Sequence, residues 1–212
     1  MRSGDPRQID HDHFLWSTLL VSDPLYDEGL PVEFAVEEAS KVVGATMFGP
    51  SGRAISVAQE RKNWCWAASV QMLRRVVGLA EKEQCEVAAK RLDKSCCLTP
   101  DVCDVRLALD HLTNLLVENG MRSQRERAQL AADTFWAELY ARRPILLADI
   151  FENGSDGHVR VAFGFQRLRR GGLVVRVADP AEAKKAATPF EELQKSRWRE
   201  TWYQIEVLDG AS

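Results

Sequence analysis

The stretch Asn63-Trp64-Cys65-Trp66-Ala67-Ala68-Ser69 sets a cysteine between two tryptophans at the start of an apolar segment. Asn63 predicts a helix N-cap, which places Cys65 in the first turn. Gly78 is a natural C-terminal stop. Between them runs an apolar stripe at helical spacing, made of Trp66, Val70, Leu73 and Val77. We therefore expect a helix over residues 63–77 that is buried along one face and carries Cys65 at its accessible end.

A cysteine at a helix N-terminus is a candidate nucleophile, because the thiolate is the reactive form and the positive end of the helix dipole favours it. Three further residues complete an order that thiol catalysis can use: Gln59 before the cysteine, His158 opening an alternating run and Asp179 closing the next one. A histidine in contact would stabilise the thiolate and protonate a leaving amine. A carboxylate would orient the imidazole, and a side-chain amide could donate to an oxyanion beside the backbone N–H of Cys65.

Each of these residues also has an ordinary structural interpretation. A lone cysteine is usually a small buried hydrophobe, and a lone histidine is more often structural or exposed than catalytic. Asp179-Pro180 is a common turn, and Gln59 could be a polar loop residue. The order and spacing of the whole set favour catalysis, whereas no member does so alone.

Asn-Trp-Cys-Trp-Ala-Ala, with a glutamine six residues before the cysteine, resembles the compact bacterial papain-like cysteine proteases, a group that includes AvrRpt2-type effector proteases of plant pathogens. The resemblance covers roughly residues 57–208. It implies that Gln59, Cys65, His158 and Asp179 form the active site and that no cofactor or metal is required. The cathepsin branch instead carries Cys-Gly-Ser/Ala-Cys around its nucleophile, and it has a longer spacing to its histidine than the 93 residues found here.

The resemblance implies a hydrolase that cleaves peptide bonds in a protein or peptide through a thioester acyl-enzyme. The same site could serve isopeptide cleavage, deamidation or acyl transfer, because these reactions share the acylation step. A catalytically relict binding module is a third interpretation, against which the intact set of four residues argues. The N-terminus has no apolar signal core, so we expect a cytoplasmic protein in the producing cell. Export by a dedicated system, as an effector or toxin with a cognate inhibitor or immunity protein, is the accompanying hypothesis.

Helical patterns come first along the chain, and strand patterns follow residue 144. The expected helices are 63–77, 83–92, 102–118 and 133–142, and the expected strands are 145–151, 158–166, 173–178 and 202–208. Turns are expected at 153–157 and 169–172. This order predicts an α+β fold, which the resemblance makes papain-like, with N-terminal helices packed on a C-terminal antiparallel sheet. His158 would begin one strand of a hairpin and Asp179 would end the next, so antiparallel pairing should bring them together.

Composition is that of a folded globular chain, with 45% apolar and 28% charged residues. A net charge of −3 offers no basic surface for nucleic acid or an acidic membrane, and no apolar run has the length of a membrane span. The turn cluster at 49–52 is a candidate boundary. We expect residues 1–50 to be an extension of unknown role and 51–212 to be the protease domain.

Four further cysteines, Cys85, Cys96, Cys97 and Cys103, lie within 19 residues of one another. Buried free thiols are the favoured interpretation, because no signal peptide directs the chain to an oxidising compartment. Two disulfides are the second interpretation, which the resemblance keeps open because relatives often carry cysteines in this segment. A metal site is the third, since the spacings fit no usual zinc pattern.

Overall fold

The computed structural model describes residues 55–151, 157–167, 173–182 and 184–211. In chain order the elements are α3 (Cys65–Val77), α4 (Gln84–Leu92), η2 (Pro100–Cys103), η3 (Leu109–His111), α5 (Leu112–Glu118), β1 (Met121–Glu126), α6 (Ala132–Tyr140), β2 (Ile145–Ile150), β3 (Gly157–Arg167), β4 (Leu173–Asp179), β5 (Lys184–Pro189), α7 (Phe190–Lys195) and β6 (Trp198–Val207). The expected extension 1–50, the expected turn at 169–172 and residues 153–156 of the turn expected at 153–157 lie outside the described residues, while Gly157 begins β3.

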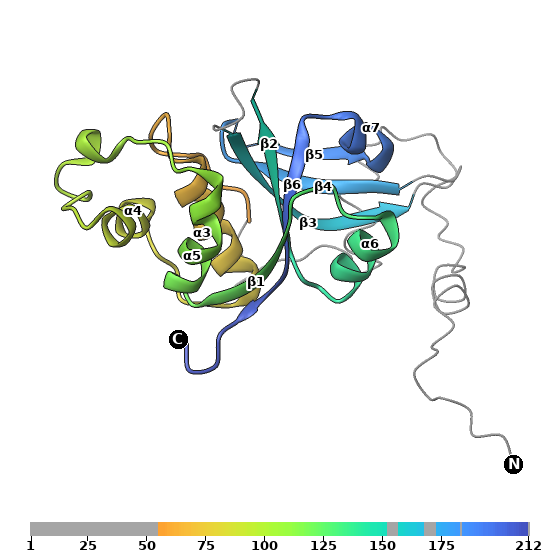
Figure 1. The fold of residues 1–212 in the computed structure, drawn as a ribbon, viewed down its shortest axis with the longest axis horizontal. Helices are drawn as coiled ribbons and strands as arrows, with labels where there is room; N and C mark the ends of the chain where they lie inside the picture. The colour runs from red at the N-terminus through yellow and green to blue at the C-terminus, as the bar shows by residue number, and fades with distance from the viewer. Residues whose placement is uncertain (1–54, 152–156, 168–172, 183, 212) are drawn as a thin grey trace, which may run out of the picture.

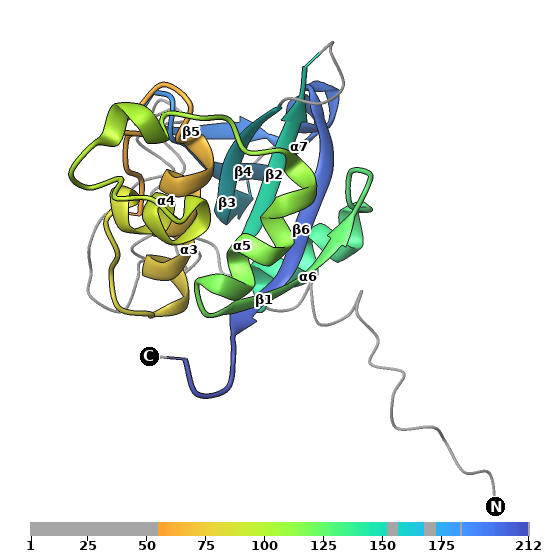
Figure 2. The same cartoon turned by 60° about the vertical axis from the view of Figure 1, so that its left-hand side comes forward.

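A six-stranded sheet occupies the centre, in the order β1-β6-β2-β3-β4-β5, and every pair is antiparallel. Helices α3, α4 and α5 gather on one side of it, and α6 and α7 lie on the other (Figures 1 and 2). The expected α+β arrangement is therefore confirmed. No helix among those described has the length and apolar character needed to cross a membrane.

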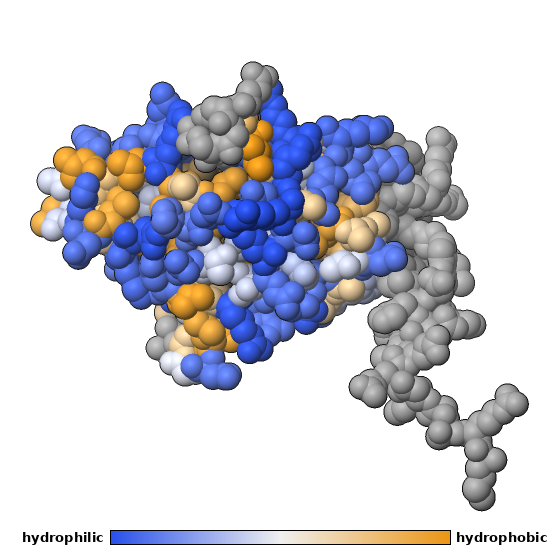
Figure 3. Space-filling view, in the orientation of Figure 1, coloured by the Kyte–Doolittle hydropathy of each residue, from blue (hydrophilic) through white to orange (hydrophobic). Residues whose placement is uncertain are grey.

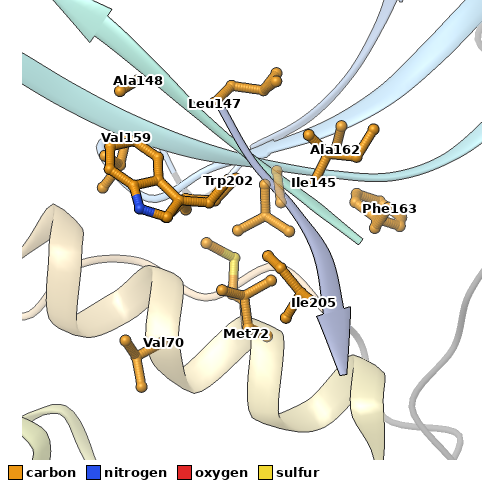
Figure 4. Close-up of a cluster of buried hydrophobic side chains, with 14 of the residues drawn as sticks. Val70, Met72, Ile145, Leu147, Ala148, Val159, Ala162, Phe163, Trp202 and Ile205 are labelled. Carbon is orange, nitrogen blue, oxygen red and sulfur yellow. The ribbon is translucent and has the colours of Figure 1, made fainter. Parts of the chain in front are cut away.

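The core between α3 and the sheet fixes the helix that carries Cys65. Figure 4 labels part of the buried apolar core around this helix: Val70 and Met72 of α3 and, from both faces of the sheet, Ile145, Leu147, Ala148, Val159, Ala162, Phe163, Trp202 and Ile205. All of these residues are at most 2% exposed. Burial of each large apolar side chain contributes about 1.5–3 kcal/mol. Residues 66–74 of α3 are buried on all sides, more completely than an amphipathic stripe predicts, because α4 covers the face that the sheet leaves free.

On the opposite side of the sheet, α6 and α7 contribute a cluster of aromatic rings. Phe135 of α6 lies 4.9 Å from Phe190 of α7 and 5.6 Å from Trp198 of β6, measured between ring centroids. Trp136 of α6 contacts Phe165 of β3 at 5.6 Å. Such pairs add about 0.5–1.5 kcal/mol each beyond their buried area, so the hairpin carrying the candidate site is packed on both faces.

The expected helix over 102–118 is wrong for its first half. That segment contains two short 3-10 turns, and only Leu112–Glu118 is α-helical. The backbone carbonyls of Cys103 and Val105 accept hydrogen bonds from the indole N–H groups of Trp64 and Trp66. These tertiary contacts hold the segment in a non-helical path, overriding its apolar periodicity.

Two strands and one helix were not predicted from the sequence. Strand β1 reads Met-Arg-Ser-Gln-Arg-Glu and buries only Met121 fully, while β5 lies at the opposite edge of the sheet. Edge strands have little apolar alternation, because one side faces solvent and no neighbour. Helix α7 has only six residues, too few for a periodic signal. Strand β6 also begins earlier than expected, at Trp198.

The four clustered cysteines form two disulfides, Cys85–Cys97 and Cys96–Cys103. The expectation of free thiols is therefore wrong. The neighbouring Cys96 and Cys97 bond to different partners, so the pair does not have to converge on one site. Within the described residues, Cys65 is the free cysteine, and no group of three or more His, Cys, Asp or Glu residues could hold a metal ion.

Candidate active site

Cys65 is the first residue of α3 and lies partly exposed in a pocket between that helix and the start of β3. Asn63 does not cap the helix, contrary to expectation: the N-cap is Trp64, and no side chain caps the first turn. The side-chain amide of Asn63 instead donates from Nδ2 to the carbonyl oxygen of Asp104 at 3.0 Å. A cap would need Asn63 Oδ1 as the acceptor, and with the amide bonded to Asp104 this oxygen instead faces Arg106 Nε at 3.4 Å.

The turn before Cys65 is held against residues 103–105 by hydrogen bonds on both sides of the cysteine. Trp64 Nε1 donates to the carbonyl of Cys103 at 2.7 Å, and Trp66 Nε1 donates to the carbonyl of Val105 at 3.1 Å. The backbone N–H of Asn63 donates to Asp104 Oδ1 at 2.8 Å. Both indoles are buried, so the two tryptophans pack in the core while their polar edges fix the neighbouring loop.

His158 and Asp179 lie at one end of the β3–β4 hairpin. His158 Nε2 and Asp179 Oδ1 are 2.6 Å apart, and the same Oδ1 accepts a hydrogen bond from the backbone N–H of Ala181 at 2.9 Å. With Nε2 engaged, Nδ1 is the ring nitrogen left for Cys65, with which His158 also shares a side-chain hydrogen bond. The structure thus brings Cys65, His158 and Asp179 together in one row.

The electrostatics of this row favour a charged imidazole. Burial alone would lower the pKa of His158, but hydrogen bonds to Asp179 and Cys65, with the charges of both, raise that pKa from 6.5 to about 10. Burial would likewise raise the pKa of Asp179, yet the hydrogen bond from His158 and the imidazolium charge hold it below its usual value. At neutral pH the site therefore contains an imidazolium beside a carboxylate.

Gly157 allows the close approach that places His158. A Cβ at this position would lie 2.5 Å from the backbone oxygen of Asp149, which pairs with β3 from β2. Any larger residue would push the strands apart at the point where the histidine enters the pocket. The Gly-His dipeptide read from the sequence thus has a steric reason in the sheet.

Gln59 lines the same pocket as Cys65 and His158. Its backbone N–H donates to the carbonyl of Pro180 at 2.8 Å, which ties the segment to the turn after Asp179. Its side-chain Nε2 donates to the carbonyls of Arg61 and Lys62, at 2.9 and 2.6 Å. Exchanging the amide nitrogen and oxygen would set Oε1 against two carbonyls, so this orientation is the favourable one. Oε1 is buried and has no partner among the described residues.

Gln84, which sequence reasoning did not single out, holds the backbone on either side of Gln59. Its Oε1 accepts from the N–H of Glu60 at 2.9 Å, and its Nε2 donates to the carbonyl of Ala58 at 2.7 Å. The same Nε2 also contacts Gln71 Oε1, in α3, at 3.2 Å. Gln84 is 1% exposed. No local pattern marks this residue, because its partners lie far away in the sequence.

The pocket combines an apolar wall with a positively charged rim. It encloses about 190 Å³. Lys62 and Arg106 contribute the cationic groups. The apolar wall consists of Trp66, Leu107, Leu109, Leu112, Phe151 and Val159. An extended chain with an apolar side chain could lie here against Cys65.

A family model described as "Papain-like cysteine protease AvrRpt2" matches residues 53–197. The chain belongs to this family. The matched region contains all four residues of the predicted site and both disulfides. Papain-like cysteine proteases are hydrolases, so the fold and the general activity expected from the sequence are confirmed. A search of curated proteins found no match.

Proposed function

We propose that this papain-like protease hydrolyses peptide bonds in a protein substrate, with Cys65 as nucleophile, His158 as acid and base, Asp179 as the group that orients the imidazole and Gln59 as an oxyanion donor. The observation that carries the proposal is the imidazole of His158, whose Nε2 lies 2.6 Å from Asp179 Oδ1 and whose charged form interacts favourably with Cys65 in the same pocket. This is the geometry that nucleophile, base and orienting group require.

Acylation follows from these positions. The sulfur of Cys65, as a thiolate, attacks the scissile carbonyl carbon and forms a tetrahedral intermediate. Its oxyanion receives a hydrogen bond from the backbone N–H of Cys65 at the N-terminal end of α3. The imidazolium of His158 gives its Nδ1 proton to the departing amine as the C–N bond breaks, which leaves a thioester on Cys65 and a neutral imidazole.

Deacylation reverses the proton flow. The neutral Nδ1 of His158 takes a proton from a water molecule whose oxygen attacks the thioester carbonyl. Collapse of the second tetrahedral intermediate expels the Cys65 thiolate and releases the carboxylic acid product. Asp179 keeps the ring aligned through both steps, because its hydrogen bond to Nε2 involves the nitrogen that takes no part in the transfer.

The role proposed for Gln59 requires a local exchange of hydrogen bonds. In the structure both donors of its side-chain amide point to the carbonyls of Arg61 and Lys62. An oxyanion is a stronger acceptor than a neutral carbonyl, so its formation would favour turning one N–H of Nε2 toward it. The donor would then act in the transition state more strongly than in the ground state, which is the condition for raising kcat.

The direct test is hydrolysis of unfolded proteins by the purified chain, with new N-termini identified by mass spectrometry. Cys65→Ala should abolish cleavage, and His158→Ala should lower kcat/KM by roughly 10³-fold or more. His111 is exposed and lies outside the pocket, so His111→Ala serves as the matched control. Cleavage that survives in Cys65→Ala would refute the assignment.

We further propose that the protein acts on a target cell after delivery by a dedicated secretion system, as an effector or toxin with a protein inhibitor in the producing cell. Support comes from the resemblance of its cysteine motif to that of effector proteases and from the match of residues 53–197 to the AvrRpt2 family model. Export of a tagged, inactive Cys65→Ala protein under secretion-inducing conditions tests the idea. Retention of the tag in the producing cells under all conditions would favour a resident processing protease.

A further inference from the structure

The loop of residues 93–105, here called the cystine loop, has almost no apolar core of its own. Between Asp93 and Val105 the only fully buried side chains are those of Cys96 and Cys103. The large apolar residues of the loop face solvent instead: Leu98 is 83% exposed and Val102 is 58% exposed. Hydrophobic atoms accordingly gather on the surface at the end of the molecule formed by α4 and η2 (Figure 3). The buried cystine thus replaces a hydrophobic core.

The two disulfides differ in position and in what they hold. Cys85–Cys97 joins the first turn of α4 to an exposed residue of the loop. Cys96–Cys103 is buried at both ends and fixes the residue that begins the contact with the turn before Cys65. Only the Cys96–Cys103 disulfide includes a residue of the segment 103–105.

Residues 103–105 in turn hold the backbone around Cys65. The carbonyl of Cys103 receives the indole N–H of Trp64, and the carbonyl of Val105 receives that of Trp66. Between them, Asp104 accepts two hydrogen bonds from Asn63. Its Oδ1 accepts from the backbone N–H at 2.8 Å, and its carbonyl oxygen accepts from Nδ2 at 3.0 Å. These four bonds flank the cysteine on both sides, at a helix end that no side chain caps.

We propose that the Cys96–Cys103 disulfide and Asp104 are positioning elements for the nucleophile, so that full activity requires this cystine together with a free thiol at Cys65. The disulfide fixes residues 103–105, and these fix the first turn of α3, including the backbone N–H of Cys65 that faces the oxyanion. A displacement of about 1 Å in such a geometry can lower a rate roughly 10²-fold. The inference rests on the proposed function of Cys65 as nucleophile.

The two disulfides provide a matched pair of variants in the full-length protein. Cys96→Ala/Cys103→Ala removes the positioning cystine, and Cys85→Ala/Cys97→Ala removes the other one. The sequence separation is 7 residues in the first bond and 12 in the second, so the control loses at least as much loop-closure entropy. If loop-closure entropy alone governed activity, the control would be impaired at least as strongly; the packing lost with the buried Cys96–Cys103 bond is controlled by measuring every variant in its folded state.

The readouts are the rate of Cys65 alkylation by iodoacetamide across the pH range and kcat/KM for a cleaved peptide, measured below the melting temperature of every variant. We expect Cys96→Ala/Cys103→Ala to lower the alkylation rate and kcat/KM on the order of 10²-fold. Cys85→Ala/Cys97→Ala should keep these two quantities within a few-fold of wild type. Equal losses in the two double variants would overturn the proposal.

Asp104 gives a test that leaves both disulfides in place, should the double variant fail to fold. Asp104→Ala removes the acceptor for the backbone N–H of Asn63, and we expect a loss of about tenfold in both rates, the worth of one hydrogen bond. Asp104→Asn retains a side-chain oxygen and should recover most of the loss. Wild-type rates in Asp104→Ala, or an Asn variant as impaired as the Ala variant, would contradict positioning. A wild-type protein inert toward both peptide and iodoacetamide would instead refute the proposed function.

Discussion

His158 Nε2 lies 2.6 Å from Asp179 Oδ1, although 21 residues separate the two in sequence. The distance is short because β3 and β4 pair antiparallel, which brings the first residues of β3 next to the last residue of β4. The contact also determines the geometry of the remaining ring nitrogen. Nδ1 is left toward Cys65, and the imidazole can transfer a proton there while it stays bonded to the carboxylate.

The raised pKa of His158 predicts an alkaline limit to activity. The protonated imidazolium, which donates to the leaving amine, persists until pH rises through about 10, and activity should be lost above that point. Asp179→Asn removes the negative charge that supports the imidazolium, so the alkaline limb of kcat/KM should move to lower pH. Comparison of the two pH profiles checks this, and His111→Ala should reproduce the wild-type limb. An unmoved limb in Asp179→Asn would show that the carboxylate does not set the pKa of His158.

Gln59→Ala should lower kcat by roughly 10²–10³-fold with a small change in KM, because the lost donor would act on the oxyanion. Affinity for a peptide aldehyde, which forms a tetrahedral adduct with the thiol, should fall in parallel. Alkylation of Cys65 by iodoacetamide involves no oxyanion and provides the internal control. Equal losses in alkylation and turnover would mean that Gln59 supports the local fold and not the transition state.

Gln84→Leu should destabilise the protein, because it leaves the N–H of Glu60 and the carbonyl of Ala58 without their partners. The expected loss of unfolding free energy is at least about 1–3 kcal/mol, the cost of one buried polar group left unpaired. Gln124→Leu on the exposed side of β1 is the control, with an expected change within about 0.5 kcal/mol. Denaturant titration measures both. Equal stability of the two variants would contradict the role given to Gln84.

Gly157→Ala should impair both folding and turnover. The added methyl group would meet the backbone oxygen of Asp149 at 2.5 Å, a distance that forces β2 and β3 to shift. Because His158 follows directly, its ring would move relative to Cys65, and kcat should fall more than peptide affinity. Thermal denaturation and steady-state kinetics report the two effects. A variant with wild-type kcat would show that the strand shift is absorbed away from the histidine.

Much of the site could be predicted because its signals are local. The tryptophan-flanked cysteine before an apolar stripe marked the start of α3 within two residues, and the Gly-His and Asp-Pro dipeptides marked the ends of the paired strands. The placement of Gln59, Cys65 and His158 around one pocket, with Asp179 in contact with His158, follows from those elements. Their catalytic roles stay predictions, which the variants above test.

The failures share a different physical origin. The helix expected over 102–118 has the right apolar spacing, but its carbonyls are taken by Trp64 and Trp66 from a distant turn. Asn63 has the right chemistry for a cap, but Asp104 engages its amide. Four cysteines allow three pairings, and local sequence does not choose among them. For the helix and the cap, a contact between segments about 40 residues apart outweighed a local preference.

The arrangement of the cysteines also bears on how the nucleophile survives oxidative folding. When two disulfides form among five cysteines, any one cysteine could stay unpaired, and only an unpaired Cys65 yields an active enzyme. The native bonds join cysteines 7 and 12 residues apart, whereas Cys65 lies 20 residues from Cys85, its nearest competitor in sequence. Loop-closure entropy then favours the native bonds over a bond to Cys65 by about twofold to fivefold. The spacing of the cysteines therefore protects the nucleophile: the four structural thiols oxidise in pairs with one another, and Cys65 keeps its free thiol.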